Sequence, residues 1–69
     1  MHLSARNMIK GTVVKVEKGQ TTAHVVLDIG GGNKITASIT NEAVDDLQLR
    51  TGLKAYAVIK ASDVMVAVD

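Results

Sequence analysis

The sequence predicts an all-β fold in a single domain that spans residues 1–69. Two observations lead to this prediction. Apolar and polar residues alternate with a period of two in the segments 21–29 and 34–40, which is the pattern of half-buried strands. Three glycines, Gly30 to Gly32, lie between these segments, and glycine accepts the positive φ angles that a tight hairpin turn requires. One hairpin is therefore expected at the centre of the chain.

The first two expected strands are joined by a short turn. The first strand runs from Met8 to Glu17 and is rich in valine and threonine, which favour strands. Lys18-Gly19-Gln20 forms the turn, and the second strand runs from Thr21 to Ile29. Its alternation places Ala23, Val25, Leu27 and Ile29 on the inward face and His24, Val26 and Asp28 on the outward face.

A third strand and one short helix follow. The third strand, Lys34 to Thr40, has Ile35, Ala37 and Ile39 inward and Lys34, Thr36 and Ser38 outward. Thr40 or Asn41 can cap the helix, because either side-chain oxygen can accept from an amide of the first turn. Glu42 lies near the positive end of the helix dipole. The apolar stripe is Ala43, Val44 and Leu47, and Thr51-Gly52 ends the excursion.

The last two expected strands, Lys54 to Lys60 and Val64 to Val68, are apolar at most positions and alternate poorly. A strand that is apolar on both faces is usually covered on both faces, so the second cover is expected from another subunit. Five strands with one short helix between the third and the fourth fit a five-stranded barrel of the oligonucleotide-binding type.

Composition favours a small protein that assembles. With 69 residues, no cysteine, no tryptophan, no phenylalanine and a single tyrosine, the core is limited. Cores of this size rarely supply more than about 3–5 kcal/mol unaided. Disulfides are excluded and no metal-ligand spacing is visible, so a homo-oligomer is expected. The chain has no membrane-spanning run and no apolar N-terminal stretch, and a cytoplasmic location is expected.

Two donor-rich segments stand near the ends of the chain. Ser4-Ala5-Arg6-Asn7 precedes Lys10-Gly11, and Lys60-Ala61-Ser62 follows the fourth strand. Their hydroxyls, backbone amides and cationic side chains can converge on an oxyanion, while neither contains a candidate catalytic base. A cage of donors alone favours molybdate, tungstate or sulfate over phosphate, which often carries a proton that needs an acceptor. The alternative is that these are ordinary turn and loop residues.

The same segments carry a family resemblance. Ser4-Ala5-Arg6-Asn7 with Lys10-Gly11, the Gly-Gly-Asn-Lys-Ile-Thr of residues 31–36, and Val58-Ile59-Lys60-Ala61-Ser62 resemble the molbindin family, whose members are also called Mop domains. These small molybdate-binding proteins are related to the TOBE-type domains of molybdate regulators and importers. The resemblance implies a barrel of the oligonucleotide-binding type, a hexamer built as a trimer of dimers, and molybdate or tungstate held between subunits.

The resemblance also assigns residues and a role. It implies an anion site made of Ser4, Arg6, Asn7, Lys60, Ala61 and Ser62, and it loosely implies a second site at Lys18, Gly19, Gln20, Thr21 and Thr22. No metal is ligated directly and no organic cofactor is implied. Because no regulator or importer segment accompanies the domain, a free-standing protein for intracellular storage or molybdenum homeostasis is expected.

Three rival functions remain open from the sequence. A single-stranded nucleic-acid module would use aromatic stacking platforms and a basic groove, whereas this chain has one tyrosine and a net charge of +1. An enzyme would need a nucleophile set, paired carboxylates or a metal triad, none of which is visible. Of the two histidines, His2 and His24, neither has a ligand partner nearby in sequence, and both are expected on the surface. A purely structural oligomerisation module differs from the anion site only in the end segments.

Overall fold

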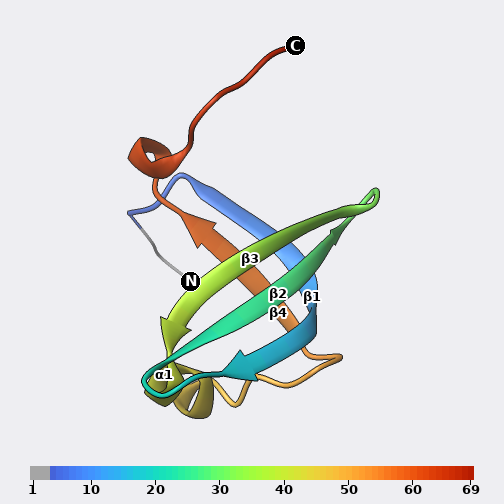
Figure 1. Ribbon diagram of the computed structural model, residues 1–69. Helices are drawn as coiled ribbons and strands as arrows, with labels where there is room; N and C mark the ends of the chain where they lie inside the picture. The colour runs from blue at the N-terminus through green and yellow to red at the C-terminus, as the bar shows by residue number, and fades with distance from the viewer. Residues whose placement is uncertain (1–3) are drawn as a thin grey trace.

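The computed structural model describes residues 4–69, and its architecture is a single antiparallel sheet that curls around an apolar interior (Figure 1). Its strand order is β3-β2-β1-β4. The elements are β1 (Asn7–Lys18), β2 (Thr22–Gly30), β3 (Asn33–Thr40), α1 (Asn41–Asp46), β4 (Lys54–Ile59) and the 3-10 turn η1 (Ala61–Asp63). The all-β class, the first four expected strands and the place of the helix are thus confirmed.

Strand β1 is the centre of the sheet because it pairs along two different stretches. Its first half pairs with β4, from Asn7 opposite Ile59 to Thr12 opposite Lys54. Its second half pairs with β2, and the register shifts by one residue between Val13 and Lys15. Such a bulge bends a strand and increases its twist. The bend lets one strand serve two partners and starts the curl of the sheet.

Gly11 lies at the crossing of these two stretches and its role is structural. A Cβ built at Gly11 would stand 2.7 Å from the backbone oxygen of Asp28, closer than side chains approach backbone. Glycine therefore permits β1 and β2 to meet where the sheet bends. This close approach gives Gly11 of the Lys10-Gly11 motif a structural role.

The core lies on the inner face of the curled sheet and is closed at one end by α1. Of the inward residues expected on β2, Ala23, Val25 and Leu27 are buried, whereas Ile29 and the inward residues of β3 are partly buried. The outward residues His24 and Asp28 are exposed. The buried cluster consists of Val13, Ala23, Val25, Leu27, Val44 and Ala57.

Helix α1 begins as expected and ends earlier. Thr40 is the N-cap, and its hydroxyl accepts from the Ala43 amide at 3.0 Å. The helix ends at Asp46, well before Thr51-Gly52, because Gln48 adopts a left-handed conformation with φ 53°. Leu47 thus leaves the helix and is 63% exposed, so its expected place in the apolar stripe was wrong.

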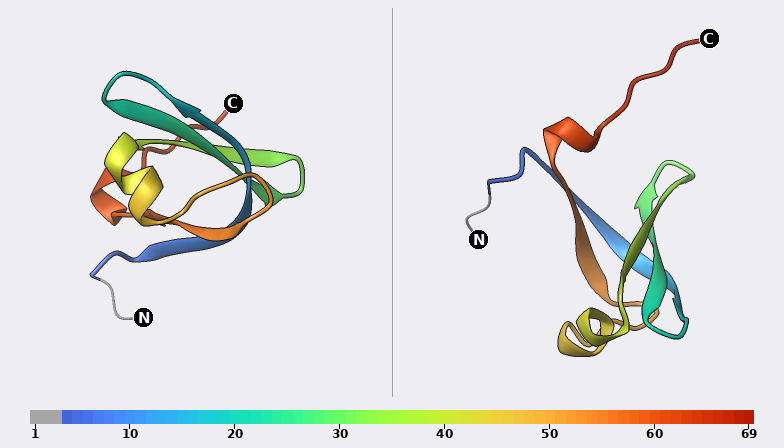
Figure 2. Two further views of the ribbon diagram at one scale, coloured as in Figure 1. Left: turned by 90° about the horizontal axis from the view of Figure 1, so that it is seen from below. Right: turned by 60° about the vertical axis from the view of Figure 1, so that its left-hand side comes forward.

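The expected fifth strand, Val64 to Val68, is not formed in the single chain. After η1 the chain runs away from the sheet (Figures 1 and 2). Met65, Val66 and Val68 are 94%, 89% and 92% exposed. A strand needs a sheet edge to pair with, and the η1 turn directs this segment away from the edges of its own sheet. The observed barrel therefore has four strands and stays open.

The opening lies between the two edge strands, β3 and β4. It forms an apolar groove with a volume of about 610 Å³. Its walls include the inward side chains of both edges, namely Ile35, Ala37, Ile39, Ala55, Ala57 and Ile59. The groove and the apolar segment 64–68 are two apolar surfaces that the single chain leaves uncovered, and Met8, Tyr56 and Val58 on β1 and β4 are exposed as well.

Candidate anion-binding site

The pairing of β1 with β4 brings the two donor-rich segments to the same end of the molecule. Asn7 is the first residue of β1, and it stands opposite Ile59, the last residue of β4. Residues 4–6 and residues 60–62 continue directly beyond this pair. The start of β1, in blue, and the η1 turn lie at the same end of the molecule in Figure 1 and in the right view of Figure 2. Segments more than fifty residues apart in sequence thus become neighbours.

The first segment offers one hydroxyl, one guanidinium and backbone amides. Ser4 and Arg6 are exposed, whereas Ala5 and Asn7 are half-buried. The Asn7 side chain donates from Nδ2 to the backbone oxygen of Ile59 at 3.3 Å. Ser4 and Arg6 therefore stand free to meet a ligand, while Asn7 is partly engaged within the chain.

The second segment is a tight turn that exposes its donors. Lys60 is extended, and its backbone oxygen accepts from the Asp63 amide at 2.9 Å. The Ala61 oxygen accepts from the Val64 amide at 3.2 Å. The carbonyl oxygens of Lys60 and Ala61 thus accept hydrogen bonds within the turn. Lys60, Ala61 and Ser62 are all exposed, so an ammonium, a hydroxyl and a small residue that permits close approach face solvent together.

The combined surface is cationic and donor-rich, with one acidic neighbour. Arg6 and Lys60 supply two positive charges, and Ser4 and Ser62 supply two hydroxyls. Asp63 follows Ser62 and is the one carboxylate within this stretch of residues 4–7 and 60–63. In the single chain every one of these groups is open to water, except for the half-buried Asn7. The charges and hydrogen-bond donors of this arrangement suit an anion.

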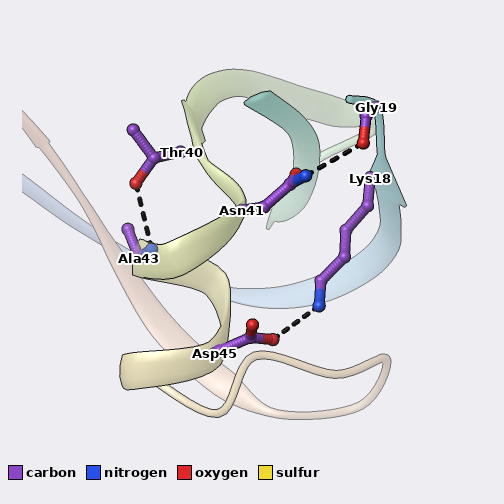
Figure 3. A network of polar contacts seen from close by, with 6 residues as sticks. All are labelled: Lys18, Gly19, Thr40, Asn41, Ala43 and Asp45. Atoms are coloured by element: carbon purple, nitrogen blue, oxygen red, sulfur yellow. Dashed lines mark hydrogen bonds and ion pairs between the residues drawn. The ribbon is translucent and has the colours of Figure 1, made fainter. Parts of the chain in front are cut away.

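The residues expected to form a second site lie at the other end of β1, beside α1 (Figure 3). Their polar groups are largely occupied by contacts within the chain. Lys18 pairs with the carboxylate of Asp45. The Gly19 amide donates to the Thr22 oxygen at 2.7 Å, and the Gly19 oxygen accepts from Asn41 Nδ2 at 2.9 Å. Gln20, Thr21 and Thr22 are exposed.

From the sequence, either Thr40 or Asn41 could cap helix α1. In the structure Thr40 is the cap, and Asn41 anchors the loop between β1 and β2. The backbone amide of Asn41 donates to the Thr21 oxygen at 2.9 Å, and its side-chain Nδ2 donates to the Gly19 oxygen. Asn41 Oδ1 is buried without a hydrogen-bond partner.

Other chemistries find little support in the described part of the chain. Residues 4–69 contain no cluster of three side chains suited to holding a metal ion. His24 is exposed as expected, and His2 lies outside the described residues. No helix within residues 4–69 has the length and apolar character needed to cross a bilayer.

Comparison with known proteins places this geometry in a family. The TOBE domain model matches residues 3–66. Molybdenum-pterin-binding protein 1 of Clostridium pasteurianum is 52% identical over 66 residues, which is 96% of this chain and 97% of that protein. The chain belongs to the Mop, or molbindin, family of TOBE domains. The resemblance carried by the end segments is therefore confirmed.

Two solved Mop structures have the same fold. An apo form of MopII from Clostridium pasteurianum superposes with a TM-score of 0.90 at 48% identity, covering 97% of this chain and all of that chain. The cytoplasmic molybdate-binding protein ModG, with molybdate bound, superposes with a TM-score of 0.90 at 49% identity. That alignment covers 94% of this chain and 46% of ModG. The four-stranded sheet with its short helix is thus shared with Mop proteins.

Proposed function

We propose that this Mop domain binds molybdate or tungstate at the surface formed by residues 4–7 and 60–62. The observation that carries the proposal is the Asn7–Ile59 pair, which brings both donor segments to one end of the sheet. The similarity to ModG, a protein solved with molybdate bound, supports the choice of ligand. The proposal is a binding role without catalysis.

The chemistry of the segments suits a fully deprotonated oxyanion. Hydrogen bonds to an ionised acceptor are roughly twice as strong as neutral ones. Ser4, Ser62 and the nearby backbone amides can donate to the oxygens, and Arg6 and Lys60 can offset the double negative charge. Phosphate is disfavoured because it often carries a proton that would find only hydrogen-bond donors around it. Leaving that O–H without an acceptor costs about 1–3 kcal/mol of binding free energy.

A subunit boundary is the favoured place for the site. In one chain the donors are exposed, and interactions between solvent-exposed charges are weak because water screens them. A neighbouring protomer that covers the end segments would exclude that water. Residues 4–7 of one chain could then face the Lys60–Ser62 turn of another. Binding to the assembled state alone also stabilises the assembly by mass action.

The apolar groove between β3 and β4 and the exposed apolar segment 64–68 support the same assembly. Segment 64–68 of one protomer has the length and apolar character of a strand, and the groove between β3 and β4 of a second copy offers two unpaired edges. Fully burying each valine or methionine contributes about 1.5–3 kcal/mol. We infer that the partner's segment 64–68 supplies the fifth strand, and that the assembly is a hexamer built as a trimer of dimers.

A free oxyanion fits better than a bound pterin. The names of several relatives refer to a molybdenum pterin. A pterin ring calls for an aromatic or apolar slot beside the anion. The single aromatic residue, Tyr56, lies on β4 opposite Lys10, three residues away from Ile59 along the strand. The donor segments themselves contain no aromatic side chain.

The physiological role that follows is storage or buffering of molybdenum in the cytoplasm. A protein that holds an oxyanion and leaves it unchanged can load when the anion is abundant and release it when the anion is scarce. ModG is described as cytoplasmic, which supports this location. A second anion site at residues 18–22 remains a prediction, and loading it requires Lys18 to exchange Asp45 for the ligand.

Calorimetric titration with molybdate, tungstate, sulfate and phosphate tests the function, combined with native mass measurement of the assembly. We expect binding of molybdate and tungstate, and at least tenfold weaker binding of phosphate, which corresponds to about 1.4 kcal/mol. Absence of heat with molybdate and tungstate, on a protein shown to be folded, would contradict the proposal. A salt-dependent shift of single-stranded oligonucleotides in place of anion binding would favour the nucleic-acid function.

A further inference from the structure

The Asn7 side chain closes the open end of the β1–β4 ladder. Its Nδ2 donates to the Ile59 oxygen across the outermost residue pair of the two strands, at 3.3 Å. The bond joins residues 52 positions apart. Within residues 4–69, it is the one side-chain hydrogen bond that links the start of β1 to the end of β4. Asn7 therefore ties together the two segments of the proposed site.

Beyond this pair, no hydrogen bond among residues 4–69 holds residues 4–6 or the Lys60–Ser62 turn to the sheet. The bonds of the η1 turn are local, from Asp63 to Lys60 and from Val64 to Ala61. Residues 4–6 take part in none of the described backbone bonds outside the strands. The separation between the Ser4–Arg6 segment and the Lys60–Ser62 turn is thus set at the last rung of the ladder, where Asn7 sits.

We propose that Asn7 is a positioning residue, whose side chain aligns the two donor segments instead of contacting the anion. This inference rests on the proposed function. One Asn7 N–H is engaged by Ile59, and its Oδ1 is an acceptor that would repel an oxyanion inside a cage of donors. In a symmetric assembly, the Ser4–Arg6 segment of one protomer can meet the Lys60–Ser62 turn of the next only if each protomer holds its own two segments at a fixed separation. Asn7 supplies that fixed separation within each chain.

The test compares wild type with Asn7→Ala and Asn7→Leu, the second of which keeps most of the side-chain volume. Asn33→Ala, an exposed asparagine at the distant hairpin, is the matched control. Three quantities are measured on the intact protein: molybdate affinity by calorimetry, the thermal unfolding midpoint without ligand, and amide hydrogen exchange of residues 7, 8, 59 and 60 without ligand.

A positioning role predicts a specific combination. Molybdate affinity falls about three- to tenfold in both Asn7 variants, the size expected from one neutral hydrogen bond. Exchange at the β1–β4 end becomes about threefold faster without ligand, and the unfolding midpoint falls by no more than about 5 °C, the shift that the same loss of free energy produces in a domain of this size. The Asn33 variant changes none of the three quantities.

Each other outcome overturns the inference in a distinct way. Unchanged affinity with normal wild-type binding means that Asn7 does not organise the site. Weakened affinity with unchanged exchange makes Asn7 a direct ligand. Weakened affinity with a large loss of midpoint makes its role a general structural one. If wild type itself binds no molybdate, the proposed function fails, and the positioning role fails with it.

Discussion

The body of the sheet and the two end segments of this Mop domain are held by different forces. The body, β1 to β4 with α1, surrounds a cluster of buried aliphatic side chains and keeps its shape by burial and by paired backbone groups. The end segments, residues 4–6 and 60–69, are exposed except for the half-buried Ala5, and they are held by the Asn7–Ile59 pair and by the local η1 turn. Stability resides in the first region and the proposed chemistry in the second.

This separation has a physical reason. A chain of 69 residues has too little volume to bury an ion deeply and still build a core. Placing the donors beyond the ends of two paired strands leaves the core apolar, and among the described residues no polar or charged residue is buried as a whole, although the Asn41 Oδ1 atom is. The donors can then be desolvated by a neighbouring protomer. If the two regions are independent, a variant that disturbs one should leave the other unchanged.

Truncating the core should damage the body. Leu27→Ala removes a side chain that is 5% exposed and should lower the free energy of unfolding by about 2–5 kcal/mol through lost burial and a residual cavity. That loss is similar in size to the whole folding free energy expected from a core of this size. Chemical denaturation measures the change. A loss below about 1 kcal/mol would mean that contacts outside the core stabilise the domain.

Removing donors at the ends should abolish binding and spare the body. We expect Ser4→Ala combined with Lys60→Ala to weaken molybdate binding at least about a hundredfold, since a hydroxyl and a charge are lost together. Molybdate at a hundred times its dissociation constant should stabilise wild type by about 2.7 kcal/mol and the variant hardly at all. Ser38→Ala with Lys34→Ala, on the outer face of β3, is the matched control. Equal ligand-induced shifts in both double variants would place the site elsewhere.

A change at the helix start should affect the body alone. Thr40→Ala removes the hydroxyl that accepts from the Ala43 amide and should cost about 1 kcal/mol of unfolding free energy. Molybdate affinity should stay unchanged, because α1 lies at the other end of β1 from the donors. Denaturation and titration of the same sample check both parts. A change of affinity would show that the two regions are coupled.

The smallest effect is expected at the exposed Lys18–Asp45 pair. Asp45→Asn should change the unfolding free energy by less than about 1 kcal/mol, as is usual for exposed ion pairs. It should also free Lys18 for the second predicted anion site. A titration that shows an added weak binding step in this variant, absent from Lys18→Ala with Asp45→Asn, would support that site. Identical isotherms for the two variants would argue against it.

The parts of the fold that depend on local pattern could be predicted from the sequence. The alternation of Ala23, Val25 and Leu27 and the glycine turn after it specify a hairpin without reference to the rest of the chain. The exit from α1 could not be predicted, because Gln48 takes a left-handed conformation that glutamine rarely adopts. The choice between Thr40 and Asn41 as cap depended on a contact between Asn41 and Gly19, far apart in sequence.

Non-local pairing explains what was missed at the ends. Segment 64–68 has the composition of a strand, but composition does not specify which edge it meets, and in the single chain it pairs with neither β3 nor β4. The donor residues of the site could be selected from their chemistry and family resemblance. Their meeting at one end depends on the β1–β4 register, and the engagement of Asn7 with Ile59 depends on side-chain geometry at that rung.

A crystal structure grown with molybdate, with anomalous diffraction recorded at the molybdenum edge, tests the central claim most directly. We expect a molybdenum peak between Ser4 and Arg6 of one protomer and the Lys60–Ser62 turn of its neighbour, with the body unchanged. A protein that takes up the anion, yet shows residues 4–6 and 60–62 far apart in solvent with no peak between them, would contradict the account.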